Sequence, residues 1–120
     1  MNTCLLVIDV QESFRHRPYW SEAALPAYLA AQNALIDGCR ARGVPVVRIL
    51  HTDDETVAGS PFALASGHVR PLAGLVDFAE DARFLKTRHG ALVGTGLDVW
   101  LTRRGIGRLI TRFDGASDGT

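Results

Sequence analysis

Four apolar residues in a row, at positions 5–8 (LLVI), are followed directly by an acidic residue, Asp9. A short uninterrupted apolar run is typical of a strand that is buried on both faces, as in a parallel sheet. An acid placed directly after such a strand lies at the carboxyl edge of the sheet, where open α/β folds bind their ligands. The sequence therefore predicts an α/β fold and makes Asp9 the first candidate for a functional residue.

The pattern after this start alternates between helix and strand. Apolar residues recur at three- and four-residue spacing over 25–39, which predicts a helix with Pro26 in its first turn and Gly43 at its end. The apolar stretch 44–50 predicts a second strand, so the first fifty residues form a right-handed βαβ unit. Further on we expect a short helical turn in 72–81, strands at 82–86 and 106–110, and a helix at 92–104.

Two loops are expected over the sheet edge. The first, 12–21, carries several aromatic residues, which either line a pocket or cover the end of the core. The second, 51–71, is long for a compact domain, and loops of that length are usually functional or mobile.

Composition narrows the class of protein. The 120 residues are enough for one domain, and the 13 Lys and Arg residues balance the 13 Asp and Glu residues. With no net charge, a nucleic-acid or acidic-membrane partner is not indicated. No apolar run approaches the roughly 18 residues of a membrane helix, and no signal peptide is visible, so we expect a cytoplasmic protein. Cys4 and Cys39, the only cysteines, are expected to be buried thiols without a disulfide.

Several segments together resemble one known family. The segments LLVIDVQESF, RARGVPVVRILHT, SPFALASG and FLKTRHGALVGTGLDVWLTRRGIGRLI are similar to the isochorismatase-like cysteine hydrolases, a superfamily that includes nicotinamidases and N-carbamoyl amidohydrolases. The resemblance implies a Rossmann-like three-layer αβα fold with a parallel sheet of order 3-2-1-4-5-6, of which this chain has strands 1–4. It also implies hydrolysis of a C–N amide or carbamoyl bond, or a related bond, in a small molecule.

The resemblance also implies the catalytic residues. Members of the family use an Asp, a Lys and a Cys; Asp9 matches the Asp and Lys86 matches the Lys. Asp9 would take the proton of the thiol, and Lys86 would stabilise the anion and orient Asp9. Gln11 and Phe14 are expected to contact substrate.

The family's cysteine has no counterpart in this sequence. It normally begins the helix after the fourth strand, whereas here Ile110 is followed by TRFDGASDGT, which has no apolar periodicity. We therefore divide the chain into the N-terminal part of a hydrolase domain, 1–110, and a polar tail, 111–120. We expect a gene truncation or frameshift near Ile110, with a deliberate short variant as the alternative.

Two functions follow from that difference. The first is a hydrolase that is inactive as this chain because the nucleophile is missing. The second is a non-catalytic remnant that binds a small molecule or another subunit, and a homo-oligomer is left open. The substrate and the oligomeric state are not fixed by the sequence.

Metal and cofactor sites are not expected. Nicotinamidases bind a divalent ion through an Asp and two His, and His51, Asp53 and His68 fall in the corresponding loop, but their order and spacing do not match that motif. A dinucleotide-binding Rossmann fold is excluded because no GxGxxG motif follows Asp9.

Overall fold

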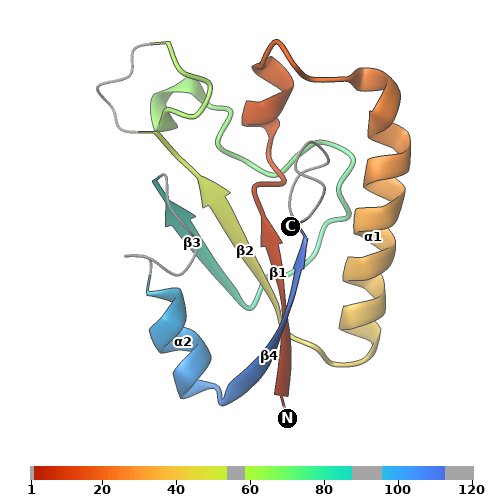
Figure 1. Cartoon of the computed structure of the whole chain (residues 1–120), viewed down its shortest axis with the longest axis vertical. Coiled ribbons are helices and arrows are strands. Elements are labelled where there is room, and N and C mark those ends of the chain that lie inside the picture. Colours follow the sequence, from red (N-terminus) through yellow and green to blue (C-terminus); the bar gives the residue numbers. More distant parts are fainter. Residues whose placement is uncertain (1, 54–58, 88–95, 113–120) are drawn as a thin grey trace.

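The computed structural model describes residues 2–53, 59–87 and 96–112. They form a parallel four-stranded sheet with one long helix on one face and a short helix on the other (Figure 1). The strands are β1 (Asn2–Ile8), β2 (Val46–His51), β3 (Ala82–Lys86) and β4 (Ile106–Arg112), and the helices are α1 (Leu25–Ala41) and α2 (Leu97–Arg103). The order β3-β2-β1-β4 confirms the predicted α/β fold and the predicted order of its first four strands.

β1 lies inside the sheet, between β2 and β4, and is buried on both faces as its apolar run predicts. Leu5 and Val7 pack in the cluster that contains Ile36 of α1. Leu6 and Ile8, which point to the opposite face because side chains alternate along a strand, pack in the cluster of Leu97 and Leu101 of α2. Two cores therefore hold β1 in place, and its carboxyl end is the fixed point from which Asp9 projects.

The ends of α1 follow the predicted signals. Pro26 lies in the first turn, where its missing N–H costs no helical hydrogen bond. Gly43 follows the helix with φ of 72°, a left-handed conformation that favours glycine, and its N–H donates to the carbonyl of Arg40 at 3.1 Å. The chain then turns directly into β2.

The predicted helical turn in 72–81 is wrong for most of its length. Leu72 begins a single turn, closed by the N–H of Leu75, and the chain is then extended up to β3. The reason lies in partners distant in sequence: the N–H of Val76 donates to the Asn33 side chain at 2.6 Å, and the N–H of Asp81 donates to the carbonyl of Val46 at 2.9 Å. These bonds replace the ones that a helix would supply.

The loops contain short 3-10 helices that the sequence did not predict: η1 (Glu12–His16), η2 (Glu22–Ala24) and η3 (Leu64–Ser66). β3 has its predicted bounds. α2 begins at Leu97, and residues 88–95, which include the expected start of this helix, lie outside the described part of the chain. β4 continues to Arg112, two residues past the expected end of the hydrolase part; residues 113–120 are also outside the described ranges. None of the described helices is both long and apolar enough to span a lipid bilayer.

Candidate active site

Asp9 follows β1 directly and has the only left-handed backbone of the described non-glycine residues, with φ of 61°. Its N–H donates to the carbonyl of Ile49 at 2.9 Å, which ties the turn to β2. A non-glycine residue in this region costs on the order of 1–3 kcal/mol, and such residues gather at functional sites. The turn therefore holds Asp9 at the carboxyl edge at some cost in stability.

Lys86 is the last residue of β3, and its Nζ lies 3.2 Å from Oδ1 of Asp9. Only 12% of the lysine side chain and 16% of the aspartate side chain are exposed, so water screens this ion pair weakly. Asp9 Oδ1 accepts no aligned hydrogen bond from the described residues, so the contact is between charges rather than a directed bond. The two residues predicted as catalytic are thus brought together, across the end of β2.

His51 ends β2 and stands opposite Lys86 in the strand register. Burial lowers the pKa of His51 below its ordinary value of 6.5 and the charge of Lys86 lowers it further, while Asp9 and Asp53 partly offset this. The imidazole is therefore neutral at pH 7. From the sequence, His51 was considered only as a metal ligand, and nothing placed it beside Asp9 and Lys86.

Asp53 connects His51 to the second loop. Its Oδ1 lies 3.4 Å from His51 Nε2, and its Oδ2 accepts a 2.6 Å hydrogen bond from the hydroxyl of Ser60. In a hydrolytic triad the serine bonds to the histidine, which acts as its base. Here the serine bonds to the carboxylate instead, so Ser60 is not an activated nucleophile.

Gln11 is 1% exposed, and its amide is used within the fold. Its Nε2 donates to the carbonyl of His51 at 2.8 Å and to the hydroxyl of Ser13 at 2.9 Å, and its Oε1 accepts from the N–H of His51 at 2.7 Å. The side chain therefore pairs with β2 as a strand would and joins the ends of β1 and β2. Its contact with substrate stays a prediction.

Phe14 lies on η1 and packs edge-on against Phe62, with ring centroids 4.8 Å apart. Phe62 is buried and also meets the ring of His51 at 5.2 Å. Sequence reasoning missed Phe62, although it is the only aromatic residue in the long loop between 51 and 71. It closes the space between the two loops, and the contact of Phe14 with substrate stays a prediction.

The residues weighed for a metal do not form a site together. His51 pairs with Asp53, whereas His68 stacks on His16 with ring centroids 3.7 Å apart. Over the ranges that the structure describes, no group of three or more His, Cys, Asp or Glu residues is placed to hold a metal ion. The donor set of a nicotinamidase-like metal site is therefore not assembled by the described residues.

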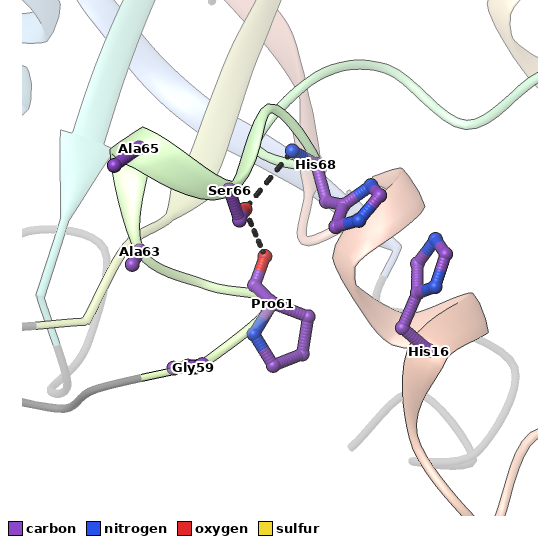
Figure 2. Close-up of a pocket in the computed structure, with 8 residues that line it drawn as sticks. His16, Gly59, Pro61, Ala63, Ala65, Ser66 and His68 are labelled. Atoms are coloured by element: carbon purple, nitrogen blue, oxygen red, sulfur yellow. Dashed lines mark hydrogen bonds between the residues drawn. The ribbon is translucent and has the colours of Figure 1, made fainter.

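A pocket of about 440 Å³ lies between η1 and the loop 59–68 (Figure 2). Those two segments follow β1 and β2, so the pocket lies beyond the carboxyl ends of the strands, as Asp9 and Lys86 do. Neither Asp9 nor Lys86 lines the pocket. Two connections reach it: Gln11 bonds to Ser13, whose hydroxyl donates to the carbonyl of His68 at 2.9 Å, and Asp53 bonds to Ser60.

Both cysteines are free and buried, away from this edge. Cys4 lies inside β1, and burial, the charge of Asp81 and the neighbouring Cys39 raise its pKa to about 11. Burial also raises the pKa of Cys39 in α1. Both side chains therefore stay protonated at neutral pH, and a protonated thiol is a poor nucleophile.

Comparison with known proteins shows which family the chain resembles in sequence and in structure. A family model described as the isochorismatase domain matches residues 3–111. A protein from Burkholderia xenovorans LB400 assigned as an isochorismatase is 32% identical, with a TM-score of 0.77 over 92% of this chain. An isochorismatase-family protein from Chromobacterium violaceum is 25% identical, with a TM-score of 0.75 over 92%. N-carbamoylsarcosine amidase from Thermoplasma acidophilum, at 22% identity and a TM-score of 0.69 over 93% of this chain, shares the fold.

The chain covers only part of each of these proteins: 53% of the Burkholderia protein, 56% of the Chromobacterium protein and 67% of the amidase. No curated protein sequence matches the chain.

Proposed function

The chain belongs to the isochorismatase domain family, and we propose that its Asp9–Lys86 pair is the proton-transfer part of a site that hydrolyses a small molecule. The bond we propose is a C–N amide or carbamoyl bond, or a related one. The observation that carries this proposal is the ion pair itself: a carboxylate and an ammonium held 3.2 Å apart at the carboxyl edge of a parallel sheet. Carboxylates in such positions serve as general bases.

The roles follow from the charges. A thiol at this site would give its proton to the Asp9 carboxylate, and the resulting thiolate would attack the carbonyl carbon of the substrate. Asp9, now protonated, would return the proton to the leaving nitrogen, and water would release the acyl group from sulfur. Lys86 would favour the thiolate and hold Asp9 in place through their ion pair.

We propose that the 120-residue chain does not carry out this reaction by itself. Its two cysteines are buried and have raised pKa values, so neither supplies the thiolate. Loss of the nucleophile in a comparable hydrolytic site costs on the order of a million-fold in turnover. Asp9 and Lys86 would then be the catalytic groups that this chain supplies.

The test is an assay of the purified chain with N-carbamoyl amino acids and nicotinamide, a choice guided by the name of the amidase neighbour. We expect release of ammonia at the uncatalysed rate. Hydrolysis that Asp9→Asn abolishes would refute the proposed inactivity while supporting the role of Asp9.

The gene offers a second test. Sequencing from the codon for Gly105 onward, with all three frames read, tests whether any frame encodes a cysteine followed by a helix pattern. A protein extended in that frame should hydrolyse one of these compounds, and Asp9→Asn and Lys86→Met should each reduce its kcat by about 100-fold or more. An extended protein that keeps its kcat in both variants would overturn the catalytic assignment.

The remaining assignments complete the proposal. We propose a cytoplasmic protein that acts on a small molecule and has no nucleic-acid partner, because positive and negative residues are equal in number and the thiols are free. The alternative, a non-catalytic module that binds another subunit, is favoured by the position of β4 at one edge of the described sheet.

A further inference from the structure

We propose that Gln11 is a positioning residue of the proposed site: its side-chain amide holds the end of β2 against the end of β1 and so sets the distance between Asp9 and Lys86. Gln11 acts on the pair through the backbone of His51. The inference rests on the proposed function only in calling the pair catalytic, because the geometry that Gln11 sets is measurable without turnover.

Asp9 and Lys86 come from strands that are not neighbours. Asp9 follows β1, Lys86 ends β3, and β2 lies between these two strands (Figure 1). The 3.2 Å contact between Lys86 Nζ and Asp9 Oδ1 therefore depends on how the end of β2 is held on each of its two sides. Catalytic groups are sensitive to such placement, since a displacement of about 1 Å can cost about 100-fold in rate.

On the side that faces β3, the end of β2 is held by backbone pairing. His51 stands opposite Lys86 in the strand register. The next residue, Thr52, donates its N–H to the carbonyl of Lys86 at 2.9 Å. Lys86 is therefore attached directly to the end of β2, and the two should move together.

On the side that faces β1, the backbone pairing stops earlier. The register between β1 and β2 ends at Ile8 and Ile49. The N–H of Asp9 still donates to the carbonyl of Ile49 at 2.9 Å, and the left-handed turn at Asp9 follows. The N–H and the carbonyl of His51, two residues further along β2, bond instead to the Gln11 side chain, at 2.7 Å and 2.8 Å. The Gln11 side chain thus continues the pairing that the backbone of β1 ends at Asp9.

The orientation of the Gln11 amide is determined by its partners. Its Nε2 donates to the carbonyl of His51 and to the hydroxyl of Ser13, and that hydroxyl donates its own hydrogen to the carbonyl of His68. A flipped amide would bring its oxygen against the carbonyl oxygen of His51. Gln11 is 1% exposed and Ser13 is fully buried, so water does not compete for these bonds. The link between the two strand ends is therefore a rigid one.

The test measures how strongly Asp9 and Lys86 each act on His51, by NMR titration of the labelled 120-residue chain. Burial and the charge of Lys86 lower the pKa of His51, whereas the charges of two carboxylates, Asp9 and Asp53, raise it. In Gln11→Met, Asp9→Asn should shift this pKa by about half as much as in the wild type or less, because the end of β1 is no longer held beside His51. Lys86→Met should shift it as much as before, since β2 and β3 stay paired.

Ser13→Ala is the matched control. It removes one hydrogen bond of the same amide but keeps both bonds to His51, so the effect of Asp9→Asn should keep its wild-type size. If Gln11→Met does not fold, Gln11→Asn, whose side chain is shorter, takes its place and should give the same pattern.

Three outcomes would overturn the inference: an undiminished effect of Asp9→Asn in the Gln11 variant, an equal loss of the Asp9 and Lys86 effects, or an equally reduced Asp9 effect in Ser13→Ala. Each would leave the catalytic assignment of the pair standing. Conversely, an extended protein that hydrolyses its substrate at full rate in Asp9→Asn would reject the proposed function and leave the positioning by Gln11 intact.

Discussion

At the scale of single residues, the pKa of His51 depends on the charges of both Asp9 and Lys86. Burial and the charge of Lys86 lower its pKa, whereas Asp9 raises it. We expect Lys86→Met to raise the pKa of His51 and Asp9→Asn to lower it further, as measured by NMR titration of labelled histidine. Arg104→Gln, whose charge is remote, is the control and should leave the titration unchanged. Shifts of the same sign in the two variants would contradict the arrangement of this edge.

The same histidine makes stability depend on pH. Because the pKa of His51 is lower in the folded chain than its ordinary value of 6.5, the unfolded chain binds the proton more readily. The free energy of unfolding should therefore fall as the pH falls through 6.5, as seen by urea denaturation at about pH 7.5 and about pH 5.5. His51→Gln should flatten this step. A stability that rises on acidification over this range would show that the sign is wrong.

The site residues differed in how far the sequence revealed them. Asp9 was predicted because it follows an apolar strand directly, and Lys86 because it matches the lysine of the family that the sequence resembles. The amide pairing of Gln11 with β2 could not be predicted, since an exposed and a buried glutamine look alike in a sequence. Phe62 was missed and His51 was considered only as a metal ligand, because their positions depend on which loops come together, and that is decided by contacts distant in the chain.

At the scale of elements, Gln11 is a side-chain link between β1 and β2. Gln11→Leu would leave the N–H and the carbonyl of His51 without their partner, at a cost of about 1–3 kcal/mol for each buried group. We expect a loss of about 2–5 kcal/mol in the free energy of unfolding, measured with urea. Asn33→Leu is the matched control: it also removes an amide with two backbone partners, but at a more exposed place where water replaces them. Equal losses would mean that Gln11 is not a buried link.

Glu80 joins the extended segment before β3 to β2. It lies 2.6 Å from Arg48, which is only 4% exposed, and 2.6 Å from Arg83, which is 47% exposed. Burial raises the pKa of Glu80, but hydrogen bonds from Arg83 and Arg48 outweigh this and lower it. Glu80→Ala leaves the buried Arg48 charge unpaired and should cost about 3–5 kcal/mol.

Arg83→Ala, which removes only the exposed partner of the same carboxylate, should cost about 1 kcal/mol or less. Thermal and urea unfolding of the two variants measure the difference. If Arg83→Ala proves as costly as Glu80→Ala, the stabilisation does not come from the buried pair.

Helices and strands that are determined by residues close to them in the sequence could be predicted. α1 has an apolar face with one polar position, Gln32, and terminal signals within its own sequence, and β3 is bounded by charged and turn residues. The extended segment 76–80 was not predictable because its conformation depends on Asn33 in α1 and Val46 in β2. The helical tendency of this segment is overridden by contacts that become available only once the sheet has formed.

At the scale of the whole molecule, the strand order came from the family resemblance rather than from periodicity, which indicates strands but not their neighbours. The strand order decides which strands are buried inside the sheet and which form its edges. β1 and β2 are inside and apolar, while β3 and β4 are the two edges of the described sheet. β3 has five residues and β4 has seven; each strand carries two charged residues and exposes one leucine, Leu85 to 45% and Leu109 to 39%. Because short edge strands offer few unpaired backbone groups, the longer β4 is the edge that we expect to pair more readily with another chain.

We therefore expect the chain to self-associate through β4, with a thermal midpoint that rises with concentration because a dimer is stabilised by mass action. Leu109→Lys places a charge on that edge and should shift the sedimentation profile toward monomer. Val99→Lys on α2 replaces another exposed apolar residue (50% exposed, against 39% for Leu109) away from the sheet edge and is the control. A sharp, concentration-independent transition of a monomer would show that the β4 edge is not used, whereas association that survives Leu109→Lys but not Leu85→Lys would assign it to β3.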